Sequence, residues 1–179
     1  FNSAEFTQFV QDHLDEDPAG LLFKYQGKVA FDLKTAVQQI AARQKTSKKL
    51  PTWSKNLDLL FPASISVEQC SSEQTATFKS AGRRGGWMID LTGGFGVDCY
   101  HLSQGFEKGV YCEQQAELFQ ISIHNLSALN PGKFDFVEGN GLDFLQIDFP
   151  RQLQWYIFPC SPLKGSGKLT PQEKLSHQK

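Results

Sequence analysis

The chain has 179 residues, a formal net charge of -1 and four cysteines. This length predicts one domain with a small appendage, and the near-neutral charge excludes binding to a polyanion through bulk electrostatics. No apolar run reaches the ~20 residues of a membrane span, and no signal peptide is evident, so a cytoplasmic protein is expected. The cysteines lack a C-x-x-C pair and a histidine at metal spacing, which favours buried reduced thiols and no metal site.

Apolar residues recur at helical spacing through residues 1–80, which predicts a helical N-terminal extension. A first apolar face lies within residues 6–14. Asp17 followed by Pro18 is typical of a helix start, because aspartate caps the free amides and proline suits the first helical position. Asp32 can cap a third helix with an apolar stripe from residue 33 to residue 41.

Polar residues and a proline interrupt this pattern over residues 46–56. Ser66 and Gln69 then have the spacing of a capping box, which predicts a further helix ending near Ser80. The glycine-rich and arginine-rich residues 82–86 are expected to form a linker.

Short apolar runs alternate with helical patterns after this linker. The expected strands are residues 87–91, 109–113, 134–138 and 155–158, and the expected helices between them are residues 97–103 and 115–129. This alternation predicts βαβ crossovers and a parallel, Rossmann-like α/β sheet within residues 81–160. Residues 161–179 are polar and aperiodic, so a disordered tail is expected.

The segment "MIDLTGGFGVD" (88–98) ends the first expected strand in an aspartate and a glycine loop. Gly94 and Gly96 would let a ligand lie against bare backbone, and a helix starting near Val97 would offer amide donors. Glu113 closes the second strand, where a carboxylate can accept both hydroxyl hydrogens of a ribose. The combination indicates a cofactor that contains a nucleoside.

The charge of Asp90 favours one class of cofactor. Beside a pyrophosphate an aspartate would be repulsive, whereas the sulfonium and ammonium of S-adenosyl-L-methionine would attract it. Cys99 also stands where dinucleotide-binding loops carry a third glycine. A dinucleotide such as NAD, bound by an oxidoreductase, and a tight turn without a ligand remain the alternatives.

Three segments resemble motifs I, II and III of class I S-adenosylmethionine-dependent methyltransferases, namely "IDLTGGFGVD", "YCEQ" and "VEGNGLDFL". Together with "LPTW" and "EQCSSEQTA" they resemble more closely uncharacterised bacterial methyltransferases that carry a THUMP-like domain at the C-terminus. Enzymes that methylate guanine in RNA are more distantly similar. The resemblance covers residues 6–149 and implies a Rossmann-like sheet behind a helical N-terminal domain, with transfer of a methyl group to a base nitrogen in RNA.

The resemblance also implies which residues bind the cofactor. The glycine-loop residues hold its methionine half, Glu113 binds the ribose hydroxyls, and the ends of the second and third strands border the adenine. The implied set is Asp90, Thr92, Gly94, Phe95, Gly96, Asp98, Glu113, Gln114, Asn140 and Gly141. Gln69 and Ser72 could reach the cofactor carboxylate, although capping a helix is the alternative role.

The sequence departs from the family pattern after the fourth strand. The family carries an aspartate followed by proline, alanine and two arginines, whereas this chain reads "WYIFPCSP". Phe158 stands in place of the aspartate, so the catalytic residue is unknown. A frameshift just before Pro159 is one explanation, because the codons of Pro-Cys-Ser-Pro read one base later can encode Pro-Ala-Arg-Arg; a chance match is the other. The sheet is expected to be truncated after four strands and the chain to be impaired, which leaves a non-catalytic cofactor-binding module as an alternative.

Basic residues surround an aromatic side chain in the extension. They are Arg43, Lys45, Lys48, Lys49 and Lys55 near Trp53, with Lys79, Arg83 and Arg84 before the first strand. Such a set could bind the RNA backbone and stack a base, or it could be an ordinary solvated face. His101 and His124 are expected to be packing or surface residues, and the oligomeric state is not predicted.

Overall fold

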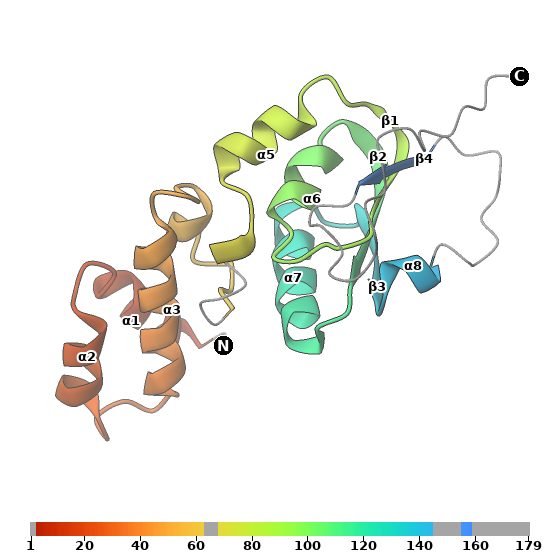
Figure 1. Ribbon diagram of the computed structural model, residues 1–179. Helices are drawn as coiled ribbons and strands as arrows, with labels where there is room; N and C mark the ends of the chain where they lie inside the picture. The colour runs from red at the N-terminus through yellow and green to blue at the C-terminus, as the bar shows by residue number, and fades with distance from the viewer. Residues whose placement is uncertain (1–2, 63–67, 145–154, 159–179) are drawn as a thin grey trace, which may run out of the picture.

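The computed structural model describes residues 3–62 and 68–144 and the backbone of residues 155–158. A group of helices at the N-terminal end lies beside a parallel sheet with its own helices (Figure 1). Some predictions concern residues that lie outside the described part of the chain, namely Ser66, Cys160, the sequence from Pro159 onward and the tail 161–179.

Three helices form the N-terminal group, as predicted: α1 (Ala4–Asp12), α2 (Pro18–Tyr25) and α3 (Leu33–Thr46). Each begins at a side chain that accepts a backbone amide hydrogen: Ser3, Asp17 and Asp32. The apolar faces of these helices meet in a cluster of their own, whose buried members are Phe6, Phe9, Val10, Leu21, Ala36, Val37 and Ile40. A short 3-10 helix, η1 (Trp53–Lys55), follows.

The helix predicted to run from residue 66 to residue 80 is interrupted. Residues 68 and 69 are helical, residues 70–72 are not, and α5 (Glu73–Ser80) starts again behind them. Ser72 causes the new start, because its hydroxyl accepts the amide hydrogen of Thr75 at 3.1 Å and donates to the Thr75 hydroxyl at 2.9 Å. The expected capping box was therefore the wrong start for α5.

The α/β unit then follows as β1 (Gly85–Asp90), α6 (Val97–Ser103), β2 (Phe106–Glu113), α7 (Ala116–Leu129), β3 (Phe134–Glu138), α8 (Gly141–Phe144) and β4 (Trp155–Phe158). This is the predicted order except for the short helix α8, which was not predicted. The sheet order is β3-β2-β1-β4, and every pair is parallel. The largest differences from the predicted bounds are at the starts of β1 and β2. Gly85 and Gly86 belong to β1 rather than to a linker, and β2 begins at Phe106 with the exposed charged residues Glu107 and Lys108.

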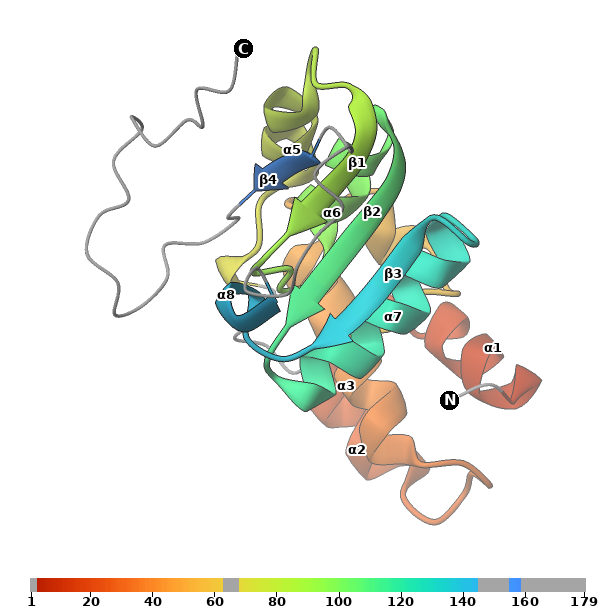
Figure 2. The ribbon, with the colours of Figure 1, turned by 90° about the vertical axis from the view of Figure 1, so that its right-hand side faces the viewer.

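Side chains of the strands alternate between two apolar clusters, one on each face of the sheet. Met88, Tyr111 and Phe134 pack with residues of α6 and α7 on one face, while Ile89, Val110 and Cys112 lie in the other cluster. Figure 2 views the sheet with α7 behind it and α8 beside the ends of the strands. The arrangement is a mixed α/β, Rossmann-like fold. Within the described part of the chain, no helix has both the length and the apolar character to cross a membrane.

Candidate cofactor site

The glycine loop connects the carboxyl end of β1 to α6 and continues the pairing of the sheet. The amide of Gly93 donates to the carbonyl of Cys112 at 2.8 Å, and the amide of Gly96 donates to the carbonyl of Gly93 at 2.9 Å. Gly94 and Gly96 have φ values of +55° and +84°, in the left-handed region that favours glycine. The backbone conformation by itself therefore accounts for these two glycines.

Three side chains hold Gly94 in place. Its amide donates to Oε2 of Glu113 at 3.0 Å, and its carbonyl accepts hydrogen bonds from the hydroxyl groups of Tyr111 and Ser122, the latter at 2.9 Å. Burial raises the pKa of Tyr111, so its hydroxyl stays protonated and able to donate. Sequence reasoning identified Glu113 but missed Tyr111 and Ser122. The available signal for Tyr111 was its place in β2, two residues before Glu113.

Gly93 has a packing reason to be glycine. A Cβ atom at this position would lie 2.0 Å from the ring of Tyr111, closer than any contact that real side chains make. The loop backbone is thus pressed onto the Tyr111 ring, and the ring is in turn buried under α7 with Phe119 and Leu126. Gly93 is therefore required by the close contact between the loop backbone and the Tyr111 ring, and Gly94 and Gly96 are required by their left-handed backbone conformation.

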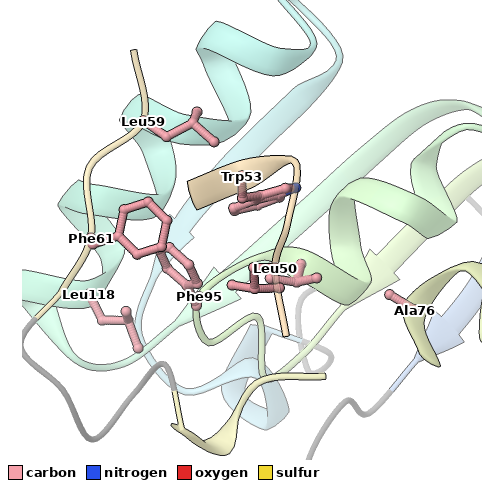
Figure 3. Packing of buried hydrophobic residues seen from close by; sticks show 8 residues of the cluster. Leu50, Trp53, Leu59, Phe61, Ala76, Phe95 and Leu118 are labelled. Carbon is pink, nitrogen blue, oxygen red and sulfur yellow. The ribbon is translucent and has the colours of Figure 1, made fainter. Parts of the chain in front are cut away.

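Phe95 points away from the mouth of the loop. Its side chain is 2% exposed and belongs to a cluster with Leu50, Trp53, Leu59, Phe61, Ala76, Val97 and Leu118. Figure 3 labels all of these residues except Val97. The Phe95 side chain is therefore not available to the cofactor, and the expectation that Phe95 belongs to the cofactor site stays a prediction that concerns its backbone. The ring packs between the sheet unit and the helical extension, because the left-handed glycines on either side turn it inward.

Asp98 is also directed away from the loop. Its carboxylate forms an ion pair with Lys79 at 2.9 Å and accepts a hydrogen bond from the hydroxyl of Ser71 at 2.7 Å. Lys79 in turn donates to the hydroxyl of Ser71 at 2.8 Å. The Asp98 carboxylate therefore binds α5 and Ser71 in this structure, and a contact between Asp98 and the cofactor stays a prediction.

Two buried carboxylates remain at the carboxyl edge of the sheet. Asp90 ends β1, is 0% exposed and accepts the amide hydrogen of Thr92 at 3.1 Å. Glu113 ends the neighbouring strand β2, is 6% exposed and accepts amide hydrogens from Gly94 and, at 2.8 Å, from Gln115. A carboxylate offers about four lone-pair positions, so Glu113 keeps capacity for further donors. Burial and the charge of Asp90 together raise the pKa of Cys112 to about 12, so this thiol stays protonated.

The end of β3 meets the same edge. The amide of Gly139 donates to the carbonyl of Glu113 at 2.9 Å. Gly141 lies so close to β1 that a Cβ atom there would be 2.3 Å from the carbonyl oxygen of Leu91. Asn140 accepts the amide hydrogen of Leu142 at 2.9 Å and is exposed, as is Gln114. The structure therefore brings together Asp90, Thr92, Gly94, Gly96, Glu113, Gln114, Asn140 and Gly141 at the edge where parallel sheets bind ligands.

The other candidate residues lie elsewhere or have structural partners. Ser72 caps α5, and Gln69 is exposed. Trp53 is 2% exposed and cannot stack on a base in this structure. Arg43 is buried and donates to the carbonyls of Ser54, Asn56 and Leu59, and burial lowers its pKa to about 10. Both side chains are buried and so have no surface to offer RNA in this structure, whereas RNA contact by the protein stays a prediction.

The basic side chains that remain are divided between ion pairs and solvent. Lys45 forms an ion pair with Glu68, and Lys79 forms the pair with Asp98. Lys48, Lys55 and Arg84 are exposed. His101 and His124 pack at helix surfaces, where they contact the Thr77 hydroxyl and the Asp58 carbonyl respectively.

Comparison with known proteins supports a methyltransferase-like fold. The structure resembles the crystal structure of a putative methyltransferase from Porphyromonas gingivalis W83, with a TM-score of 0.69 and 28% sequence identity, over 82% of this chain and 38% of that chain. Precorrin 8W decarboxylase from Methanobacterium thermoautotrophicum aligns over 51% of this chain and 47% of that chain, at 15% sequence identity. Its TM-score of 0.37 is too low to indicate a shared fold. No family model and no curated protein matches the sequence.

The present chain thus spans about 38% of the length of its structural neighbour from Porphyromonas gingivalis. The Rossmann-like sheet, the loop after β1 and the TM-score of 0.69 together show a methyltransferase-like fold. Among the described residues, Cys70, Cys99 and Cys112 form no disulfide with one another.

Proposed function

We propose that the carboxyl edge of the sheet binds S-adenosyl-L-methionine. The observation that carries the proposal is the buried carboxylate of Glu113, which ends β2, holds the glycine loop through Gly94 at 3.0 Å and keeps lone pairs for other donors. A ribose offers two hydroxyl hydrogens to such a group. Asp90, on the adjacent strand, supplies negative charge near the cationic half of the cofactor.

Different residues at this edge would bind different parts of the cofactor. Asp90, Thr92, Gly94 and Gly96 would hold the methionine half, and Gln114, Asn140 and Gly141 would border the adenine. The bound cofactor would supply an activated methyl group on its sulfonium. The protein's own contribution would be to orient the acceptor in line with that group and to exclude water, since methyl transfer depends mainly on positioning.

We further propose that the parent activity methylates a base nitrogen in RNA, within the group of methyltransferases that carry a THUMP-like C-terminal domain. The resemblance of "LPTW" and "EQCSSEQTA" to that group supports this acceptor. The exposed cations Lys48, Lys55 and Arg84 could contact phosphates. Trp53 takes no part in the proposal, because it is buried.

A second candidate function is cofactor binding without catalysis. Phe158 is the last residue of β4 and pairs in register with Asp90 of β1. The family resemblance places an aspartate at this position, where its oxygen would accept a hydrogen bond from the target nitrogen. Phenylalanine has no acceptor, so we propose that this chain transfers methyl groups poorly even when the cofactor is bound.

Calorimetry with S-adenosylhomocysteine and with NAD tests the cofactor. Binding of the first ligand alone is expected; binding of NAD alone would replace the methyltransferase proposal with an oxidoreductase.

A tritiated-methyl transfer assay on total RNA and on protein then tests catalysis. We expect negligible turnover by the 179-residue chain, recovery when the reading frame after residue 149 is restored, and no recovery with Phe158→Asp alone. Clear turnover by the chain as it stands would contradict the proposed impairment. Nucleotide sequencing of the locus in independent isolates decides between a frameshift and a genuine sequence after Phe158.

A further inference from the structure

The helical extension contacts the glycine loop through Phe95. The ring of Phe95 packs edge-on against Trp53 at a centroid distance of 5.3 Å and lies 5.3 Å from the ring of Phe61 (Figure 3). Since the side chain is 2% exposed, it has no surface for a ligand. Any effect of Phe95 on binding must therefore pass through the backbone of Gly94 and Gly96, which flank it.

A second, polar connection lies on the other side of the loop. Asp98 is in the first turn of α6, two residues after Gly96, and its side chain is 7% exposed. Lys79 and Ser71 bind its Oδ2 atom at 2.9 and 2.7 Å, so α5 and the residue before its cap hold the start of α6. This connection shares no side chain with the Phe95 cluster.

A third contact fixes the partner of Phe95. Oε1 of Glu73, the first residue of α5, accepts the amide hydrogens of Thr52 and Trp53 at 2.9 and 3.0 Å. Trp53 is thereby held where Phe95 packs. The loop thus has two sets of contacts, one with Glu113, Tyr111 and Ser122 of the sheet unit and the other with the extension.

We propose that the extension is a positioning element of the cofactor loop, with Phe95 and the Asp98–Lys79 pair as its two points of action. This inference rests on the proposed function, because it concerns affinity for the same cofactor. If the extension fixes the backbone conformation of Gly94 and Gly96, a variant that loosens its contacts must have a lower affinity for the cofactor. By the same coupling, the bound cofactor must stabilise the extension. The second statement is the thermodynamic counterpart of the first.

The affinity of S-adenosylhomocysteine, measured by calorimetry, tests the first statement. Phe95→Ala is expected to weaken binding about 10-fold and Phe95→Leu by less, because leucine refills part of the cluster. Leu21→Ala is the matched control: Leu21 is 1% exposed in the separate cluster of α1, α2 and α3, which has no residue of the loop. It should lose stability yet keep its affinity within about 2-fold.

Hydrogen exchange at the amides of Thr52 and Trp53 tests the reciprocal statement. S-adenosylhomocysteine should slow their exchange in the wild type and in Leu21→Ala, and the effect should disappear in Phe95→Ala. Loss of stability alone would not abolish this dependence on the ligand.

The outcomes separate the two proposals. A wild-type chain that does not bind S-adenosylhomocysteine overturns the proposed function itself. Binding by the wild type with equal affinity in Phe95→Ala overturns the positioning role. Should Phe95→Ala fail to fold, Phe95→Leu and Lys79→Gln decide the matter, and unchanged affinity in both overturns the inference.

Discussion

Glu113 combines two tasks in one carboxylate. It accepts the amide hydrogens of Gly94 and Gln115 and, in the proposed function, both ribose hydroxyls. Glu113→Ala should weaken the binding of S-adenosylhomocysteine by about 1–3 kcal/mol, which lowers the affinity ~5- to 150-fold, because buried donors then lose their acceptor. Glu138→Ala is the control, since Glu138 ends the next strand but is exposed. Calorimetry checks the affinities and circular dichroism the fold. Equal affinity in Glu113→Ala and the wild type would remove Glu113 from the site.

Substitution of Gly93 or of Gly94 by alanine should reduce the stability of the protein by different amounts. A Cβ at Gly93 would meet the Tyr111 ring at 2.0 Å, whereas a Cβ at Gly94 has only the Thr92 carbonyl nearby, at 3.7 Å. Gly94→Ala should therefore cost about 1–2 kcal/mol of stability through its positive φ alone, and Gly93→Ala should cost more. Urea unfolding measures both. A Gly93→Ala protein as stable as Gly94→Ala would contradict the packing argument.

A bulkier change at Gly94 tests the ligand rather than the fold. Gly94→Val is expected to abolish binding of S-adenosylhomocysteine, because the side chain would occupy the space where the cofactor approaches the backbone. The measurement is calorimetry on protein shown to be folded. A folded Gly94→Val variant that binds normally would mean that the loop is a turn and nothing more.

At the scale of elements, α5 and α6 partly bury His101, and this burial disfavours protonation of the imidazole. His101 is half-buried, and its Nε2 atom has no hydrogen-bond partner within the described part of the chain. Burial lowers its pKa, against smaller opposing effects of Glu73 and Asp98. The unfolded chain thus takes up a proton near pH ~6.5 before the folded chain does, so stability should fall as the pH drops through that value.

His101→Gln should remove this part of the pH dependence. The free energy of unfolding, measured with urea at about pH 7.5 and about pH 5.5, should fall less in the variant than in the wild type. Thr77→Val, which removes the hydroxyl beside Nδ1 but leaves the imidazole, serves as the comparison. An identical pH dependence in His101→Gln and the wild type would show that another group is responsible.

At the scale of the whole molecule, the boundary predicted near residue 80 has side chains packed across it. Leu50, Trp53 and Phe61 of the extension share one buried cluster with Phe95 and Leu118 of the sheet unit. Asn125 of α7 also binds both the amide and the carbonyl of Leu60 at 2.8 Å. The division into a helical extension (1–80) and a Rossmann-like domain (81–160) stays a prediction, and residues of both parts lie in one buried cluster.

One cooperative unfolding transition is therefore expected. Far-UV circular dichroism and tryptophan fluorescence should give coincident urea curves, because unfolding of either part would expose the buried cluster that both parts share. Asn125→Ala should lower the urea midpoint for both probes together and reduce the free energy of unfolding by about 1–3 kcal/mol, since the partly buried amide and carbonyl of Leu60 lose their partner. Two separated transitions would show that the extension and the sheet unit are independent domains.

Much of the fold could be predicted from residue order alone. Helical spacing and caps such as Asp17 and Asp32 located α1, α2 and α3, and the change to short apolar runs located the four parallel strands. The edge that gathers Asp90, Gly94 and Glu113 was also predictable. Parallel strands end at one edge, so residues that follow successive strands must meet there. These features depend on local periodicity and on chain direction, which a single sequence carries.

Only the tertiary structure decided which way the side chains of the remaining candidates point. Phe95 and Asp98 lie within four residues of each other in the loop and α6, yet both turn toward the extension, toward Trp53 and Lys79 respectively. Arg43 and Trp53 carry the residue types of an RNA-binding surface, yet both are buried. Burial is set by partners that are distant along the chain and by the volume they leave, and no local pattern encodes either.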